Sequence, residues 1–234
     1  MSFDRDDLKR AAAQRAVEFV ESGMIVGLGT GSTAGFVVEQ LASRVARGLA
    51  VVAIPTSEQT AGLARRLRIP LATFAEHRRI DLAIDGADEV QRTTLDLIKG
   101  RGGALLREKI VAAASRRFIV VVDQEKLVDR LGEHAPVPVE VVQFGWQATA
   151  AALEKLGADA ELRQAGGQPF VTDGGNFIID CHFGPIDDPQ NTEPLIRMTV
   201  GVVESGLFIG RSSAVVVATD SGVDIMTGTG GKAR

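Results

Sequence analysis

The sequence predicts an α/β fold, in which an open, mostly parallel sheet with helices on both faces is joined to a small α+β satellite subdomain. Short apolar runs alternate with segments of helical periodicity through the first half of the chain, as in successive βα units. The pattern changes after Asp129, where Pro136 and Pro138 interrupt helical continuity. The 234 residues are 45% hydrophobic and 24% charged, which excludes disordered, collagen-like and coiled-coil chains.

In the first half, helices are expected where apolar residues recur at three- and four-residue spacing. Leu8, Ala12, Ala16 and Phe19 show this spacing, and Gly23 ends the segment. The expected helices cover residues 7–22, 36–45, 58–67 and 104–114. The expected strands are continuously apolar, which indicates burial on both faces and therefore a parallel sheet. They cover residues 24–28, 50–54, 80–84 and 118–122.

The segment after Asp129 mixes extended and helical patterns. An extended run to Val142 precedes a helix expected over residues 146–156. Asp173-Gly-Gly175 is a turn signal, and the apolar runs on either side of it, 170–172 and 176–180, predict a hairpin. A further helix is expected around residues 194–198. These elements predict a small, antiparallel satellite.

The last part of the chain carries three short apolar runs, at 207–209, 214–218 and 223–226. We expect all three to be strands that return to the first sheet. The expected domain organisation is therefore an α/β catalytic domain of residues 1–129 and 206–234, with the smaller α+β subdomain at 130–205.

Composition also bounds the class of protein. The formal net charge of −4 argues against a nucleic-acid binder, which normally carries a basic excess. The charged N-terminus is not expected to be a signal peptide, and no apolar run approaches the roughly 20 residues of a membrane helix. Cys181 is the single cysteine and is expected in the core, so a cytoplasmic protein without disulfides is expected. The three scattered histidines supply no metal cluster.

A glycine-rich loop, Gly27-Leu-Gly-Thr-Gly-Ser-Thr-Ala34, follows the first expected strand. Glycines let backbone amides approach an anion, and the next helix adds the positive end of its dipole. The hydroxyls of Thr30, Ser32 and Thr33 add short donors. A dinucleotide site would need an acidic residue after the second strand, where the sequence has Ile54-Pro-Thr-Ser57. A small-molecule phosphate therefore suits the loop better than NAD, and a plain strand-to-helix turn is the alternative.

Two carboxylates follow the expected strand 80–84, in Asp85-Gly-Ala-Asp88. Asp85 is expected at the carboxyl end of a buried strand, where open α/β sheets bind their ligands. Such a pair can hold sugar hydroxyls or divide acid and base roles. The alternative is ordinary Asp-Gly turn chemistry, with Asp88 as a cap.

A third candidate runs from Lys99 to Lys109, where a lysine precedes the glycine-rich Gly100-Arg-Gly-Gly103 and a helix follows. Glu108 lies in an apolar setting that suits a general base, since its helical neighbours are Ala104, Leu105, Val111 and Ala112. An exposed Arg-Glu-Lys patch on the helix is the alternative.

Taken together, these segments resemble ribose-5-phosphate isomerase of the A type. The resemblance covers nearly the whole chain in order, and its further matches are Asp123-Gln-Glu-Lys126, Thr172-Asp-Gly-Gly-Asn176 with Ile178-Ile-Asp180, and Gly206-Leu-Phe-Ile-Gly210. Two segments depart from the family pattern. Arg101 stands where many members have glycine, and residues 211–220 differ from the commoner acidic version.

The resemblance implies an aldose–ketose isomerase that interconverts ribose 5-phosphate and ribulose 5-phosphate through an enediolate, in the pentose phosphate pathway, without cofactor or metal. Glu108 would be the proton-shuttling base, and Asp85, Asp88 and Lys99 would complete the catalytic set. The implied substrate-binding residues are Thr30, Gly31, Ser32, Thr33, Asp85, Gly86, Ala87, Asp88, Lys99, Gly100, Arg101, Gly102 and Lys126. The implied partners are a sugar phosphate and further copies of the chain, in a homodimer or homotetramer, with no nucleic acid and no membrane.

Two other classes stay open on the sequence. A CoA-transferase of related architecture would use a glutamate as nucleophile, and it should need a longer chain or a partner subunit. A sugar-phosphate sensor without catalytic activity would keep the phosphate loop, and it should carry a DNA-binding helix pair that the short N-terminus does not offer.

Overall fold

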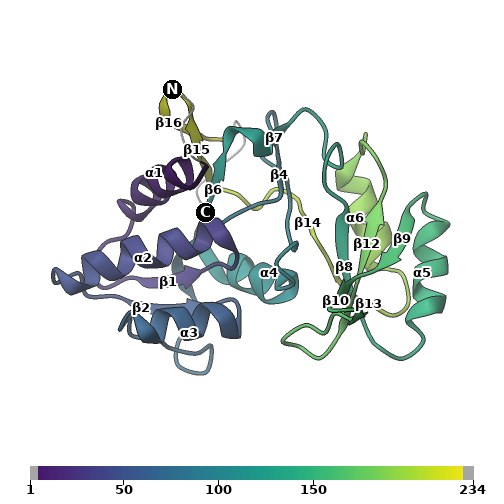
Figure 1. The fold of residues 1–234 in the computed structure, drawn as a ribbon, viewed down its shortest axis with the longest axis horizontal. Helices are drawn as coiled ribbons and strands as arrows, with labels where there is room; N and C mark the ends of the chain where they lie inside the picture. The colour runs from purple at the N-terminus through teal and green to yellow at the C-terminus, as the bar shows by residue number, and fades with distance from the viewer. Residues whose placement is uncertain (1–4, 229–234) are drawn as a thin grey trace. The chain divides into compact units, whose positions relative to one another are not determined.

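The computed structural model describes residues 5–228, and these form two compact units, each with its own apolar core (Figure 1). Unit 1 contains the described residues up to Ala87, the segment Arg107–Lys126 and the described residues from Arg211 on. Unit 2 contains Asp88–Leu106 and Leu127–Gly210. No helix among residues 5–228 combines the length and the apolar character needed to cross a membrane.

Unit 1 is built on a 6-stranded sheet in the order β16-β15-β6-β3-β1-β2. Every neighbouring pair is parallel except β15 and β16, which are antiparallel. The prediction of a mostly parallel sheet is confirmed. Its strands are β1 (Ile25–Leu28), β2 (Val52–Pro55), β3 (Ile80–Asp85), β6 (Ser115–Asp123), β15 (Ala214–Thr219) and β16 (Gly222–Met226).

Helices cover both faces of this sheet, and strand β1 shows why, because its alternate residues point to opposite faces. Val26 and Leu28 lie in one core cluster with buried residues of helices α1 (Arg5–Val17) and α2 (Ser32–Ala46). Gly27 faces the other side, where a Cβ would lie 2.5 Å from Val111 of helix α4 (Leu105–Ala114). A larger side chain at position 27 would therefore push α4 away from the sheet.

Several helix boundaries differ from the prediction, and the two largest differences in unit 1 have local reasons. Helix α1 ends at Val17 instead of residue 22, and the chain continues in tighter turns in which the Val20 amide donates to Val17 O at 3.0 Å. Helix α2 begins at Ser32, four residues earlier than expected, because Gly31 takes a φ of 112° and turns the chain directly into the helix. Helix α3 (Glu58–Arg66) begins at the expected residue and ends one residue early.

Unit 2 contains two 4-stranded sheets, ordered β13-β8-β12-β9 and β14-β5-β4-β7, and a small β10-β11 ribbon. Helices α5 (Trp146–Glu154) and α6 (Pro189–Arg197) place Leu153 and Ile196 in its core. The strands of the first sheet are antiparallel: β8 (Val137–Val141), β9 (Asp159–Leu162), β12 (Phe177–His182) and β13 (Val202–Ser205). The remaining strands are β4 (Glu89–Gln91), β5 (Leu97–Ile98), β7 (Leu127–Val128), β10 (Gln164–Ala165), β11 (Gln168–Pro169) and β14 (Leu207–Phe208).

Three expectations about this part of the chain differ from the structure. Residues 88–106 group with unit 2 and not with residues 1–87, because β4 and β5 pair with β7 and β14. For the same reason the run 207–209 does not return to the first sheet, whereas β15 and β16 do. The turn at Asp173-Gly-Gly175 forms, but 170–172 is not a strand, and β12 pairs instead with β8 and β9.

Candidate active site

The first part of the candidate site lies at the carboxyl ends of β1 and β3, which are neighbours in the sheet of unit 1. From β1 the chain passes through α2 to β2 on one side and then crosses to β3 on the other, which makes this point a topological switch. Open α/β sheets bind ligands at such points. The Thr30 amide donates to Asp85 Oδ1 here at 3.2 Å, so two of the predicted residues contact each other directly.

Close backbone approach holds Asp85 in this position. A Cβ on Gly29 would lie 1.9 Å from Asp85 Oδ1, so residue 29 has room only for glycine. The same oxygen accepts a hydrogen bond from the Gly86 amide at 2.7 Å. Asp85 is 3% exposed, and the half-buried Gly86 and Ala87 follow it. The strand end thus presents a carboxylate whose orientation is set by backbone amides.

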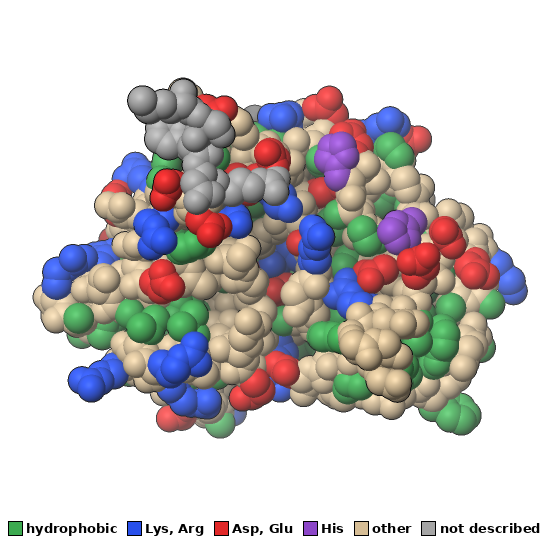
Figure 2. All heavy atoms as spheres, in the orientation of Figure 1, with side chains coloured by type: hydrophobic (Ala, Val, Ile, Leu, Met, Phe, Trp, Pro, Cys, Tyr) green, Lys and Arg blue, Asp and Glu red, His purple; other side chains and the backbone are tan. Residues whose placement is uncertain are grey.

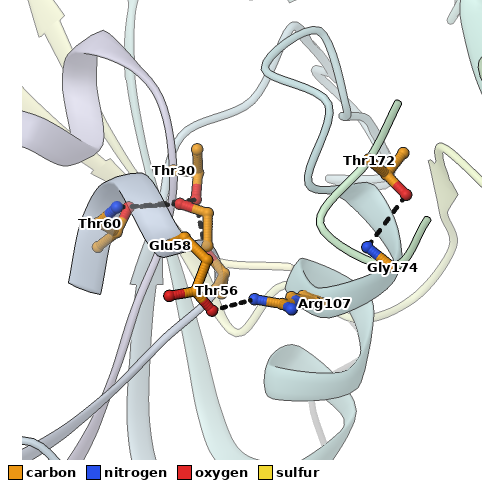
Figure 3. Close-up of polar contacts among 8 residues, drawn as sticks. Thr30, Thr56, Glu58, Thr60, Arg107, Thr172 and Gly174 are labelled. Atoms are coloured by element: carbon orange, nitrogen blue, oxygen red, sulfur yellow. Dashed lines mark hydrogen bonds and ion pairs between the residues drawn. The ribbon is translucent and has the colours of Figure 1, made fainter. Parts of the chain in front are cut away.

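A chain of hydroxyl groups fixes Thr30 from the other side (Figure 3). The Thr30 hydroxyl donates to Ser57 Oγ at 2.8 Å, and Ser57 Oγ donates to Thr60 Oγ1 at 3.1 Å. Thr60 Oγ1 donates in turn to Gly29 O at 2.9 Å. The hydroxyl proton of Thr30 is therefore already donated to Ser57. In the 2.7 Å contact between the Thr30 and Thr56 hydroxyls, Thr56 must then be the donor.

This network corrects one detail of the sequence analysis, which expected the Thr30 hydroxyl to be a donor for a ligand. Its side chain is instead part of the scaffold, while Ser32 is exposed and Thr33 is half-buried. Gly31 is the N-cap of α2 and has no side chain to cap the first turn. The amides of that turn and the two hydroxyls are therefore the donors that this loop can offer to an anion.

Helix α4 carries Glu108, which is 3% exposed, in its first turn. Leu105, Val111 and Ala112 on its apolar side are also buried, as the sequence predicts. Glu108 is therefore not part of an exposed Arg-Glu-Lys patch, which was the alternative interpretation. The next residue, Lys109, is buried as well. Arg107 is the member of this run that reaches an exposed partner, Glu58, at 3.1 Å (Figure 3).

Lys126 ends the short 3₁₀ helix η1 (Gln124–Lys126), which follows strand β6 in unit 1. Its side chain is half-buried. The turn is held by Asp123, whose Oδ1 accepts from the Glu125 amide at 3.1 Å. The lysine thus follows a buried strand at the same carboxyl edge of the sheet as Asp85.

The remaining predicted residues belong to unit 2, where the loop Lys99–Gly103 follows the two-residue strand β5. Lys99 is 2% exposed, its amide donates to Gly206 O at 2.9 Å, and its Nζ lies 5.6 Å from the centre of the Phe208 ring. Asp88 Oδ2 accepts from the Arg101 amide at 2.9 Å. Gly100 is buried, whereas Arg101 and Gly102 are exposed.

Two segments have structural roles: Glu89, which directly follows Asp88, and the matched segment 172–176. Glu89 is buried, and its carboxylate accepts hydrogen bonds from the amides of Gly132, His134 and Ala135. Thr172 and Asn176 both donate to Glu140, a carboxylate that is 1% exposed. These residues hold loops of unit 2 in place. Their hydrogen bonds explain why position 89 is acidic and why positions 172 and 176 are polar.

The chain is similar to known proteins over most of its length. A sequence model of the family described as ribose 5-phosphate isomerase A (phosphoriboisomerase A) matches residues 52–222. The chain belongs to this family. It is 62% identical to the ribose-5-phosphate isomerase A of Gloeobacter violaceus over 96% of this chain and 97% of the relative, and 56% identical to that of Gluconobacter oxydans over 92% and 94%.

Solved structures of ribose 5-phosphate isomerases share the fold over nearly their whole length. The enzyme from Methanocaldococcus jannaschii is 43% identical, with a TM-score of 0.92 over 96% of this chain and 100% of that chain. A D-ribose-5-phosphate isomerase in complex with phospho-erythronic acid is 42% identical, with a TM-score of 0.93 over the same shares of both chains.

The structure of this ribose 5-phosphate isomerase A family member also reveals polar residues that the sequence analysis did not single out. Thr56, Ser57 and Thr60 support Thr30 in unit 1, and Arg163 with Asp180 supports the Gly100 carbonyl in unit 2. Thr56 and Ser57, which directly follow the second strand, were a usable signal, because open α/β sheets bind ligands at the carboxyl ends of their strands. No local sequence pattern indicated that Arg163 supports this loop.

Cys181 lies in the core, as expected. It is fully buried in β12, and burial raises the pKa of its thiol to about 12, with a further contribution from the negative charge of Asp180. The thiol is therefore neutral at physiological pH, which does not suit a nucleophile.

Proposed function

We propose that this member of the ribose 5-phosphate isomerase A family interconverts ribose 5-phosphate and ribulose 5-phosphate through an enediolate, as a step of the pentose phosphate pathway. Similarity over almost the entire chain to isomerases of this name carries the proposal. Phospho-erythronic acid, present in one of those structures, combines a phosphate with a planar carboxylate beside a hydroxyl-bearing carbon. An enediolate has the same planarity and negative charge.

The phosphate is proposed to bind at Gly31, Ser32 and Thr33, where the first turn of α2 presents its amides. Thr30 supports this loop through its buried hydroxyl network. We assign contacts with the sugar to the two carboxylate turns and the second glycine loop, and to the half-buried cation after β6. These residues are Asp85, Gly86, Ala87, Asp88, Lys99, Gly100, Arg101, Gly102 and Lys126.

The reaction moves a proton between C2 and C1, and one base can remove it from one carbon and return it to the other. Glu108 is the proposed base, because it is buried beside apolar residues and held by a regular helix. Lys99 is the proposed cation that stabilises the oxyanion of the enediolate. Asp85 and Asp88 are proposed to orient the sugar hydroxyls and to assist ring opening. Phosphate binding supplies energy for positioning the reacting carbons.

The proposal is tested by an isomerase assay with ribose 5-phosphate in metal-free buffer containing EDTA. We expect full activity, because the proposed proton transfer uses only side chains of the protein. Turnover in D₂O should place deuterium on the carbon that receives the proton, and unphosphorylated ribose should be a poor substrate. Loss of activity in EDTA that one divalent ion restores, or exclusion of deuterium under all conditions, would contradict the mechanism.

We also propose that the chain acts in the cytoplasm as a homodimer or homotetramer, with no nucleic acid or membrane as partner. The single buried cysteine agrees with a reducing compartment. Unit 2 exposes large apolar side chains that a second copy can cover, among them Phe144 (95% exposed), Met198 (82%) and Val200 (91%). Sedimentation of an active monomer of 24.8 kDa at assay concentration would reject self-association.

A further inference from the structure

Arg163 makes an unusual set of contacts for a residue at the end of an edge strand. It follows β9 in unit 2, and its guanidinium binds both carboxylate oxygens of Asp180, with Nε donating to Oδ2 at 2.8 Å and Nη2 donating to Oδ1 at 2.5 Å. The side chains of this pair are only 13% and 18% exposed. A two-point pair of this kind fixes the plane of the guanidinium.

The third nitrogen of the Arg163 guanidinium, Nη1, faces the loop that follows Lys99. Nη1 donates to Gly100 O at 2.8 Å and to Arg101 O at 3.1 Å. The amide of Arg101 is bound to Asp88 Oδ2 at 2.9 Å. The Gly100–Arg101 peptide is therefore held at its amide by Asp88 and at its carbonyl by Arg163, and Arg163 also holds the carbonyl of the next peptide.

This loop needs an anchor because little regular structure supports it. Strand β5 before it has two residues, and Gly100 and Gly103 take φ values of 110° and 81°. Glycines with positive φ lose much backbone entropy when they are ordered. The ring of Phe170 packs against Gly103, where a Cβ would lie 2.3 Å from the ring. The Gly103 amide donates to Gly100 O at 2.9 Å, and this turn is the only backbone hydrogen bond within the described residues 100–103, so the Arg101 carbonyl depends on side chains.

The anchor itself is rigid. Asp180 lies in β12, which is paired on both sides, with Asp180 opposite Pro138 of β8 and opposite Glu161 of β9. Asp88, Arg101, Arg163 and Asp180 also line one cavity of about 380 Å³, together with His134, Glu161 and His182. Figure 2 shows charged side chains of both signs and histidines gathered on this part of the surface.

We propose that Arg163, oriented by Asp180, is a positioning residue of the isomerase: it fixes the carbonyls of Gly100 and Arg101 and, through the Arg101 amide, the carboxylate of Asp88. This inference rests on the proposed function, which assigns Lys99 and Asp88 to the site. Lysine cannot replace Arg163, because an ammonium group cannot bind a carboxylate at two points and donate to two carbonyls in the same plane.

The test compares Arg163→Lys and Arg163→Gln with matched changes at Arg130, whose Nη1 binds Asp187 at 2.8 Å on the exposed surface of the same unit. We expect Arg163→Lys to reduce kcat at least about tenfold, since a displacement of about 1 Å in a site can cost 10²-fold. KM for ribose 5-phosphate should stay within about threefold, because the proposed phosphate loop belongs to unit 1. Arg130→Lys should match the wild type in both constants.

Hydrogen exchange separates this inference from the proposed function. In Arg163→Lys the Arg101 amide should exchange at least about tenfold faster, while amides of β8 and β12 and the melting temperature stay close to those of the wild type. Faster exchange together with wild-type kcat would overturn the positioning role. Unchanged exchange would overturn the anchor itself. An inactive wild type with fast loop exchange in Arg163→Lys would contradict the proposed function and leave the anchor established.

If Arg163→Lys and Arg163→Gln unfold, Asp180→Asn gives a second route. Asparagine keeps one acceptor for the guanidinium but loses the negative charge and the second acceptor. The orientation of the Arg163 guanidinium is therefore less constrained in this variant. We expect a smaller fall in kcat of the same kind, with the same faster exchange at Arg101. A folded Asp180→Asn protein with wild-type kcat and wild-type exchange would count against the proposal.

Discussion

The glycine loops of the two units are held by different chemistry. In unit 1 the loop around Thr30 lies at the end of a fully paired parallel strand, and neutral hydroxyl groups of Ser57 and Thr60 complete its support. In unit 2 the loop after Lys99 leaves a strand of two residues, and the charged pair of Arg163 and Asp180 holds it. The loop beside the six-stranded sheet is thus supported by short hydroxyl side chains, whereas the loop after the two-residue strand is supported by one long side chain from another strand.

This difference has a consequence for how each loop responds to change. Short, buried hydroxyl bonds depend on close packing, so steric changes in unit 1 should be costly and salt should matter little. The support in unit 2 depends on the planar guanidinium of Arg163, so even a substitution that keeps the positive charge should weaken it.

The largest effect is expected from Glu108→Gln, which keeps the size of the side chain and removes the proposed base. We predict a loss of kcat of about 10²–10⁴, the usual contribution of a general base, with little change in substrate binding. Solvent deuterium should no longer enter the product. Nearly full activity, or an acyl adduct of Glu108 that hydroxylamine traps, would reject this role and favour the transferase alternative.

Gly29→Ala should break the support of the unit 1 loop by steric conflict. The new methyl group would lie 1.9 Å from Asp85 Oδ1, so the carboxylate or the strand end must move. We expect kcat/KM to fall about 10²-fold and the unfolding free energy to fall by about 1–3 kcal/mol. Gly35→Ala is the control, since a Cβ there meets nothing within 4 Å and alanine favours helix α2 by about 0.5–1 kcal/mol. Wild-type kcat/KM in Gly29→Ala would show that Asp85 does not need its present position.

Thr60→Val tests the neutral hydroxyl chain with almost no change of shape. Gly29 O would lose its hydroxyl donor in a buried site, so denaturant unfolding should show a loss of about 1–3 kcal/mol. Because no charge is involved, the loss should be the same in about 0.1 M and 1 M salt, which differ strongly in screening. Thr192→Val removes an exposed hydroxyl that donates to Asp188 O at 2.7 Å, and it should cost no more than about 0.5 kcal/mol. Equal losses in the two variants would remove the special role of the buried chain.

The smallest effect on activity is expected at Cys181, in a strand that supports the unit 2 loop through Asp180. Cys181→Ser should keep kcat and KM, and the native thiol should resist a thiol reagent at about pH 8 until the protein is unfolded. Since burial raises the pKa of this thiol from 9.0 to about 12, the folded state retains the proton that the unfolded state loses. The stability contributed by Cys181 should therefore decline as the pH rises from 9.0 to about 12. Rapid labelling of the folded enzyme would contradict this assignment.

The α/β class, the succession of the main strands along the chain and the positions of Asp85 and Glu108 follow from the sequence alone. Buried parallel strands such as β3 and β6 consist of continuous apolar runs, and the helices between them have their own periodicity and glycine stops. These signals are local, so they can be read before any packing is known. The family resemblance then assigned chemistry to the motifs at the strand ends.

Only the tertiary structure decided how the second unit is built and what holds its loop. Strands β4, β5, β7 and β14 have two or three residues each, too few for a periodic pattern, and they exist because they pair with one another. The direction of the Thr30 hydroxyl depends on Ser57, and the support of Gly100 depends on Arg163, which is 63 residues away in the chain. Contacts between residues so distant leave no local trace, because their energy arises only when the fold brings the groups together.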